Sequence, residues 1–349
     1  MSDEGFLLSA ENVRDYLVGR GLARDEEEIY VRELGGGVSN IVLAVEWPGN
    51  PERRWVVKQS LGKLRVKDDW RSDRARIFRE AEAIQALRPV LGPMAVPEVV
   101  HIDHENFLFV MTAAPAGSLV WKDLLLARGG DAVLAREAAL LLAKLVNGSV
   151  GNRKFERQFE DRAVFGQLRI DPYYQVTAGR HPELRANFEE LIETTRGVRV
   201  ALVHGDYSPK NMLVCGDNIF LIDFEVVHWG DPSFDAAFLL NHLFLKAYRQ
   251  PQVESLFIQM IEEFWQTLRS ALGHTLLGTN GFAGFEALTV YHLGGLMLAR
   301  IDGKSPVEYI QDEVTKGRVR KAARRILVEP SRELAGAIEI LREENHGKH

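Results

Sequence analysis

The strongest constraint on this chain of 349 residues is the spacing of three polar residues in its second half. Asp206 lies in a polar segment, Asn211 follows it by five positions, and Asp223 comes directly after an apolar run. Apolar runs on both sides of the polar segment indicate short strands, and the sequence Gly216-Asp217-Asn218 indicates a turn between two of them. We therefore expect Asp206 in a loop and Asp223 at a strand end, each held by rigid neighbouring structure.

Such a set of side chains suits phosphoryl transfer. That reaction needs a carboxylate to align the acceptor hydroxyl, and hard oxygen ligands to hold magnesium against the nucleotide phosphates. Asp206 can be the carboxylate, and Asn211 and Asp223 can supply the oxygens; the spacing from Asp206 to Asn211 is that of a protein-kinase catalytic loop. The alternative is a polar loop whose side chains only satisfy the backbone of a turn, which would require three matched features to coincide.

The motif residues resemble those of the aminoglycoside phosphotransferase and choline kinase superfamily, a small-molecule branch of the protein-kinase-like fold: His204-Gly205-Asp206, Asn211, Asp223-Phe224-Glu225 and Gly230-Asp231-Pro232. The resemblance implies that Asp206 is the catalytic base and that Asn211 and Asp223 bind magnesium. It also implies that Asp235 braces the catalytic loop and that His204 has a structural role.

The same resemblance implies an α+β fold of the protein-kinase-like, bilobal type. A small N-terminal lobe with an antiparallel sheet, residues 1–111, would bind the nucleotide. Residues 112–117 would form the hinge, and residues 118–349 a larger, mainly helical lobe for catalysis and substrate binding. The implied cofactors are ATP and Mg²⁺.

A glycine-rich turn precedes the β-type run 41–46 and suits the nucleotide phosphates, because glycines let backbone amides approach phosphate oxygens closely. The expected binding residues of this turn are Gly36, Gly37, Ser39 and Asn40. A hairpin turn without a ligand has the same pattern, so the turn is informative only in combination with the other motifs.

Lys58 ends the next β-type run and is similar to the lysine that anchors the α- and β-phosphates in kinases; a surface lysine at a strand end is the alternative. The apolar stripe of the helix that follows consists of Ile77, Ile84 and Leu87. Glu80 falls on this stripe, whereas Glu82 falls off it. Because a carboxylate on a buried face requires a cation, we predict that Glu80 pairs with Lys58 and that Glu82 faces solvent.

The last strand of this lobe is expected at residues 107–111, after an extended approach at 97–100. In the superfamily, backbone groups of the following hinge bind the adenine. The resemblance assigns that role to Met111 and Ala113.

A second, narrower resemblance is to methylthioribose kinases, in residues 58–61, Arg65-Val66, Trp70 and residues 73–76. Both carboxylates of the Asp-x-Glu pattern contribute to the metal site there, so Glu225 joins the predicted ligands. The catalytic loop departs from that subfamily, which replaces the asparagine equivalent to Asn211. Whether Arg324 and Arg325 match a late arginine pair that positions substrate there stays open.

The composition excludes several classes of protein. The charge balance is 43 basic against 49 acidic residues, a net charge of −6, which disfavours binding to nucleic acid. The single cysteine, Cys215, rules out an internal disulfide and suits the reducing cytoplasm. Neither a secretory signal nor a run long enough to span a membrane is evident. We expect a cytoplasmic monomer or homodimer without membrane contact.

The remainder of the chain is predicted to be helical, at residues 131–146 with Asp131 as the cap, and at 234–248, 253–272, 285–300 and 307–327, with Pro330 opening a final helix. The acceptor pocket would lie in this lobe. Aromatic residues that either line it or pack the core are Tyr173, Tyr174, Trp229 and Trp265.

Two other classes compete with a small-molecule kinase. A protein kinase needs an activation segment to dock a peptide, and here a helix follows soon after Asp223. An inactive nucleotide-binding scaffold should have lost Lys58, Asp206, Asn211 or Asp223, and all four are present. We therefore predict ATP-dependent phosphorylation of a hydroxyl on a small molecule such as a thiosugar, sugar, aminoglycoside or amino alcohol.

Overall fold

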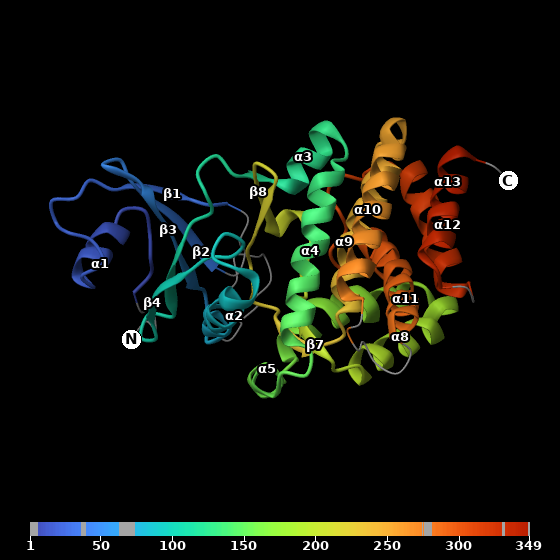
Figure 1. Cartoon of the computed structure of the whole chain (residues 1–349), viewed down its shortest axis with the longest axis horizontal. Helices are drawn as coiled ribbons and strands as arrows, with labels where there is room; N and C mark the ends of the chain where they lie inside the picture. Colours follow the sequence, from blue (N-terminus) through green and yellow to red (C-terminus); the bar gives the residue numbers. More distant parts are fainter. Residues whose placement is uncertain are drawn as a thin grey trace. The chain divides into compact units, whose positions relative to one another are not determined.

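The computed structural model describes residues 6–35, 40–62, 74–273, 275, 281–329 and 332–347. Contacts divide the chain into two compact units (Figure 1). The first unit contains Met1–Ser118 together with the short segment Phe220–Glu225. The second unit contains Leu119–Ile219 and Val226–His349. Each unit has its own core and is described separately.

The first unit is built on an antiparallel sheet. Within the described residues its strands have the order β1-β2-β3-β5-β4. The strand bounds are β1 (Tyr30–Glu33), β2 (Asn40–Trp47), β3 (Asn50–Ser60), β4 (Val99–Asp103) and β5 (Leu108–Thr112). Alternation of side chains sends Ile41, Leu43 and Val45 of β2 to one face, where they pack into one cluster with residues of α1 (Val13–Gly19).

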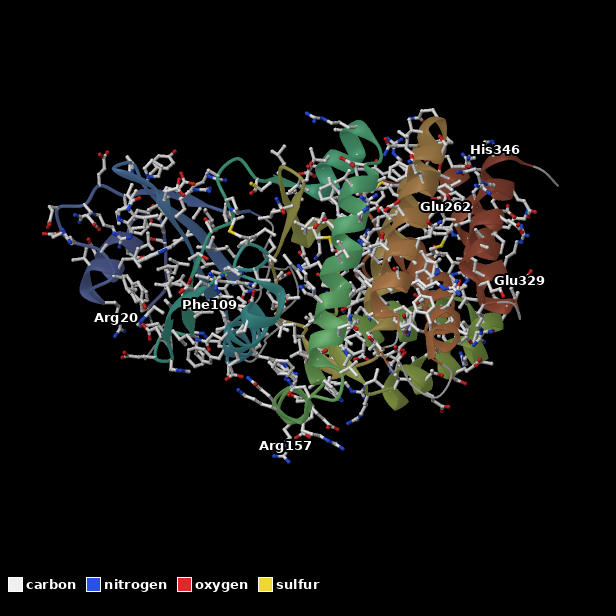
Figure 2. The ribbon with its side chains drawn as sticks, in the orientation of Figure 1. Arg20, Phe109, Arg157, Glu262, Glu329 and His346 are labelled. Carbon is white, nitrogen blue, oxygen red and sulfur yellow. The ribbon has the colours of Figure 1, made fainter. Side chains whose placement is uncertain are left out.

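Helix α2 (Arg76–Leu91) packs against β3, β4 and β5. Its buried stripe includes Ile77, Ile84 and Leu87, as the periodicity predicts, and Glu82 is exposed. Phe109 of β5 is buried inside this unit, whereas Arg20 lies at its margin (Figure 2). The packing of α2 on the sheet brings the one acidic residue of its buried stripe, Glu80, under strand β3.

The second unit is mainly helical. Helix α4 (Ala132–Ser149) lies beside α10 (Glu254–Leu272), and α9 (Ser233–Arg249) packs on both α10 and α11 (Gly281–Asp302) (Figure 1). Asp131 caps α4 by accepting from the Val133 backbone N–H at 2.9 Å. Because α9 is surrounded by other helices, nearly all its side chains are buried, and it forms the centre of this unit.

Shorter elements complete the second unit. Strand β7 (Ala201–Val203) pairs with β10 (His228–Gly230), and β6 (Leu119–Val120) pairs with β8 (Met212–Cys215). Strand β9 (Asn218–Leu221) follows β8, and its last two residues belong to the first unit. The other helices are α3 (Trp121–Arg128), α5 (Arg153–Gln158), α6 (Ala163–Phe165), α7 (Val176–Arg180), α8 (Arg185–Gly197), α12 (Glu313–Val328) and α13 (Leu334–His346). A π-helix, η1 (Gly166–Gln175), and three 3₁₀ turns, η2 (Pro182–Leu184), η3 (Pro209–Asn211) and η4 (Pro251–Val253), connect them in the described chain.

The structure corrects two expectations about the helices. The helix expected from residue 307 begins at Glu313, because Asp312 caps it there by accepting from the Thr315 N–H at 2.8 Å. Pro330 lies outside the described residues, and α13 begins at Leu334.

The expectation that no segment could span a membrane also needs a correction. By length and composition, helix α11 is long and apolar enough to cross a membrane, with a mean hydropathy of 1.2 over its most apolar window. However, 67% of that window is buried inside the protein, as in the central helix of a helical core.

Candidate active site

The first unit holds a cluster of charged side chains around Lys58. Lys58 lies on β3 and is only 7% exposed. Its Nζ atom is 2.7 Å from Glu80 Oε2 on α2 and 3.1 Å from Asp223 Oδ1. One ammonium group therefore joins a strand, a helix and the segment that the first unit draws from residues 220–225.

Charge balance in this cluster favours the protonated lysine. Burial by itself lowers the pKa of Lys58, but the charges of Glu80, Asp223 and Glu225 outweigh burial and hold the pKa above its usual range. Lys58 is thus a fixed cation beside an excess of carboxylates. Such a group can bind an anion while its own position is set by Glu80.

Asp223 adopts a strained backbone. Its φ is 70°, one of two positive values found at non-glycine residues in the described ranges. Backbone of this kind persists where surrounding structure forces it and is concentrated at functional sites. The Leu221 N–H donates to the Ala95 carbonyl at 2.7 Å, which ties this segment to the first unit and fixes the approach of Asp223 to Lys58.

Of the other residues predicted to bind the nucleotide, the structure describes some and not others. Gly36, Gly37 and Ser39 lie outside the described residues, as do Arg65-Val66, Trp70 and Asp73. Asn40 opens β2 and is buried, and β2 pairs antiparallel with β1. In the hinge, the Ala113 N–H donates to the Arg54 carbonyl at 2.8 Å, so this amide is already used within the sheet; Met111 lies in β5.

The second unit holds a separate cluster around Asp206. This carboxylate is 3% exposed, and its Oδ2 lies 3.0 Å from Arg169 Nη2 and 2.8 Å from Lys210 Nζ. Burial opposes ionisation, yet the charges of Arg169 and Lys210 hold the pKa of Asp206 well below its usual range. Asp206 is therefore an ionised carboxylate that can accept a hydrogen bond from a hydroxyl group.

Residues 204–211, here called the catalytic loop, are braced from beneath by Asp235. Its two carboxylate oxygens accept from the backbone N–H groups of His204 and Gly205, at 2.6 and 2.9 Å. Gly205 has a φ of 76°, and an added Cβ would lie 2.7 Å from Val226 Cγ1, so only glycine fits there. His204 is fully buried and its Nδ1 accepts from the Asp206 N–H at 3.2 Å, which is a structural role.

Asn211 is fixed to the same loop. Its Nδ2 donates to the Asp206 carbonyl at 2.9 Å, and this orientation turns the hard oxygen Oδ1 away from that bond. Asn211 is nearly buried. An amide held in this way is suited to coordinating a hard cation through its oxygen.

Two residues of this cluster had no role assigned from the sequence. Lys210 lies four residues after Asp206, a spacing at which the pair could have been anticipated. Arg169 lies on η1, and its Nε also donates to the Gly205 carbonyl at 2.6 Å. No local sequence signal connects Arg169 with the loop, because the contact depends on how η1 packs.

The late arginine pair is engaged elsewhere in the second unit. Arg324 contacts Glu183 at 2.7 Å and His181 Nδ1 at 2.9 Å. Arg325 pairs with Glu343 and Glu344 at 2.8 and 2.9 Å. These contacts join helices at the surface and give the pair no part in the Asp206 cluster.

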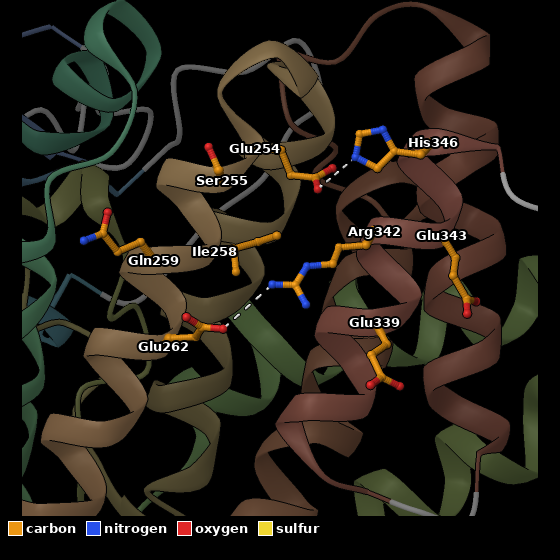
Figure 3. Close-up of a pocket in the computed structure, with 9 residues that line it drawn as sticks. All are labelled: Glu254, Ser255, Ile258, Gln259, Glu262, Glu339, Arg342, Glu343 and His346. Carbon is orange, nitrogen blue, oxygen red and sulfur yellow. Dashed lines mark ion pairs between the residues drawn. The ribbon is translucent and has the colours of Figure 1, made fainter.

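A cavity of about 600 Å³ lies between α10 and α13 (Figure 3). Figure 3 shows Arg342 pointing toward Glu262 and His346 toward Glu254, at 3.9 and 3.3 Å. None of its lining residues belongs to the Lys58 or Asp206 cluster. Two ion pairs link the helices on either side of this cavity, and the proposed reaction is placed elsewhere.

The antiparallel sheet of the first unit, the mainly helical second unit and the two charged clusters are the features expected of a kinase-like phosphotransferase. The profile of the phosphotransferase enzyme family matches residues 31–269, more than half of the chain. The chain belongs to this family, which confirms the superfamily predicted from the motifs.

Two curated relatives are similar to the chain. Methylthioribose kinase 1 of Oryza sativa subsp. japonica is 27% identical over 276 residues, which cover 71% of this chain and 63% of that protein. The methylthioribose kinase of Geobacillus kaustophilus is 22% identical over 360 residues, covering 88% of this chain and 89% of that protein.

Among solved structures, a choline/ethanolamine kinase family protein from Mesorhizobium loti has a TM-score of 0.51 at 18% identity. The superposition covers 95% of this chain and 98% of that one. The likeness confirms the protein-kinase-like fold that the sequence predicted.

Proposed function

We propose that this protein transfers the γ-phosphoryl group of ATP to a hydroxyl of a small metabolite. The single observation that carries the proposal is the buried Lys58, held between Glu80 and Asp223. A cation fixed in this way, with a carboxylate beside it, is the arrangement that kinases use for nucleotide phosphates and their metal. Membership in the phosphotransferase family supports the same reaction class.

Each residue has a defined role in the proposed reaction. Lys58 binds the α- and β-phosphates, and Glu80 orients it. The predicted turn residues Gly36, Gly37, Ser39 and Asn40 contribute to the nucleotide site, with the backbone of Met111 and the carbonyl of Ala113, whose N–H is bonded to Arg54. Asn211, Asp223 and Glu225 would hold Mg²⁺, which neutralises charge on the phosphates. Among the described residues, no group of three or more His, Cys, Asp or Glu side chains is placed to hold a metal ion.

Asp206 aligns the acceptor hydroxyl. The oxygen of the acceptor hydroxyl attacks the γ-phosphorus as the bond between that phosphorus and the ADP oxygen breaks. The hydroxyl proton passes to Asp206. Because Asp206 is ionised, it is ready to accept that proton. Arg169 and Lys210 hold the carboxylate in place.

Asp206→Asn tests this role. We expect AMP-PNP binding, measured by calorimetry with Mg²⁺, to change less than threefold, while acceptor-dependent ADP release falls by roughly 10²- to 10⁴-fold. The acceptor panel consists of methylthioribose, pentoses, aminoglycosides, choline and related amino alcohols. Comparable turnover in the variant would show that Asp206 has no role in the mechanism. If the wild type bound no AMP-PNP, both the kinase and the inactive nucleotide-binding scaffold would be refuted.

A further inference from the structure

Helix α9 carries polar side chains that the proposed reaction does not use. His242 and Lys246 follow Phe238 at intervals of four residues and so lie on one face of the helix. Asp235, which braces the catalytic loop, lies three residues before Phe238 on the same stripe. The stripe therefore begins at the loop that holds Asp206 and extends along the helix away from it.

The stripe is connected to Asp206 through Arg169. The Arg169 guanidinium, 3.0 Å from Asp206, also lies over the Phe238 ring at 5.5 Å from its centroid. The Phe238 ring in turn contacts the His242 ring at 5.5 Å. The charge of Asp206 reaches His242, although burial and the charges of Lys246 and Arg300 hold the pKa of His242 well below its usual range.

Lys246 is the unusual member of the stripe. It is 0% exposed, and within the described residues its ammonium contacts no carboxylate at ion-pair distance. Its contacts are the His242 carbonyl at 3.5 Å and the Tyr309 ring at 4.8 Å from the centroid. Glu308, whose charge reaches Lys246, is itself bound by Lys122 at 2.8 Å.

Arg300 of α11 is a second cation, and its charge reaches Lys246. Its Nη1 donates to the Tyr173 hydroxyl at 3.1 Å and to Ser305, but its Nε is buried without an acceptor in the described structure. Burial, together with the charge of Lys122, lowers the pKa of Lys246 to about 7, whereas the charge of Glu308 opposes this shift. Lys246 is buried, and Arg300 is half-buried with its Nε out of contact with solvent. Buried cationic groups are normally paired, so an anion at this place would remove a cost.

We propose that Lys246 and Arg300 bind a carboxylate or phosphate group of the acceptor whose hydroxyl Asp206 aligns. The inference rests on the proposed kinase function and narrows the acceptor to an anionic hydroxyl compound. Lys246 follows Asp235 by eleven residues, about 16 Å along the helix, and its side chain points back toward the helix N-terminus. On this rise the anionic group and the hydroxyl of the acceptor lie within roughly 16 Å of one another, which limits the acceptor to a small metabolite.

This chemistry separates the protein from kinases of cationic acceptors. An aminoglycoside or an amino alcohol would bring positive charge toward Lys246, Arg300 and Lys210. Like charges at such separations repel, and burial strengthens the effect. The aromatic rings of Tyr173, Phe238 and Tyr309 suit the apolar part of a short acid instead.

The test compares matched acceptors on the wild type. The probes are 4-hydroxybutyrate, 6-hydroxyhexanoate, 8-hydroxyoctanoate and glycerol 3-phosphate, with the amide and amino-alcohol counterparts of each acid. We expect saturable binding by calorimetry and ADP release with an acid or phosphate, and a kcat/KM at least tenfold lower for the uncharged counterpart. Failure of every acid and of glycerol 3-phosphate to bind at 10 mM would overturn the inference.

Lys246→Met supplies the second arm, with Lys154→Met as control because Lys154 is an exposed cation on α5. Lys246→Met should lower kcat/KM for the anionic acceptor about 10- to 100-fold and abolish the preference over its amide. Unchanged AMP-PNP binding and circular dichroism would show that the variant is folded. Retention of the acid preference by Lys246→Met would overturn the inference.

The outcomes also separate the two proposals. Phosphorylation of choline or methylthioribose but of none of the anions refutes the anionic acceptor and leaves the kinase function standing. Saturable binding of an anion that needs Lys246, without ADP release from any acceptor, refutes the kinase function and leaves the anion site.

Discussion

At the scale of single residues, the protein places buried charges where they restrain one another. Lys58 is held by Glu80 in the first unit, and Asp206 is held by Arg169 and Lys210 in the second. Removing one partner of a buried pair leaves the other uncompensated, so stability and function have to be measured separately at these positions.

Lys58→Met combined with Glu80→Gln makes that separation. The single Lys58→Met variant should lose about 3 kcal/mol of unfolding free energy, because Glu80 stays buried without its cation. The double variant should recover most of this loss, yet bind AMP-PNP roughly 10- to 100-fold more weakly than the wild type. Denaturant unfolding and calorimetry measure the two quantities. Wild-type nucleotide affinity in the double variant would show that Lys58 does not bind phosphates.

Lys246 predicts a specific pH dependence. Burial lowers its pKa from 10.5 to about 7 in the folded protein, so the folded state binds fewer protons than the unfolded state between these pH values. The burial cost is therefore complete below pH 7 and disappears as the pH rises toward 10.5. Lys246→Met should be more stable than the wild type by about 1–4 kcal/mol at pH 6.5, with a smaller advantage at pH 9.5. An advantage that stays constant across this range would contradict the assigned pKa direction.

At the scale of elements, α9 links loop geometry to the helical core. It is buried on nearly all sides, so the position of Asp235 beneath the catalytic loop is set by the packing of α10 and α11 around α9. Inside the loop, His204 and Asn211 bond to the backbone of Asp206, and a 3₁₀ turn spans Pro209–Asn211. Asp235 adds a brace from outside the loop. The conformation of the loop should depend on this brace.

Asp235→Ala tests the brace. The variant leaves the buried N–H groups of His204 and Gly205 without acceptors, and we expect a loss of about 2–4 kcal/mol in unfolding free energy. Turnover should fall more than tenfold while AMP-PNP affinity is kept, since the nucleotide residues of the first unit are untouched. Asp217→Ala, at an exposed turn, is the control. Equal stability of the two variants in urea would show that the loop holds its own conformation.

At the scale of the whole molecule, the chain divides its proposed tasks between two units. The first unit draws the segment Phe220–Glu225 from the far part of the sequence, and this segment delivers Asp223 to Lys58. Nucleotide binding is thereby assigned to the first unit and acceptor alignment to the second.

Hydrogen exchange with and without Mg²⁺ and AMP-PNP tests this division. At a ligand concentration of 100 times its Kd, binding should stabilise the protein by about 2.7 kcal/mol. Slower exchange should be found in β2, β3 and residues 220–225. The same experiment on the Lys58→Met, Glu80→Gln double variant should show little change. Protection confined to α10–α13 would place the nucleotide elsewhere.

The sequence alone predicted the features that depend on residues close together in the chain. Alternation and periodicity located most strands and helices, and the position of Glu80 on the apolar stripe of α2 singled it out from Glu82 as the buried acid. The spacing from Asp206 to Asn211 predicted that the two residues act from one loop, and in the structure Asn211 bonds to the Asp206 carbonyl of that loop.

Tertiary packing decided the remainder. Arg169 reaches Asp206 from a π-helix 37 residues upstream, and no periodicity records that contact. His242 and Lys246 were hidden in an apolar helix, although the rule that identified Glu80, a polar residue on a buried stripe, applied to them equally. Their partners come from α3, α11 and the segment before α12, so their chemistry emerges only when separate helices are packed together. Interactions between neighbours in sequence are encoded in the order of the residues, whereas the environment of a buried charge is created by every element that surrounds it.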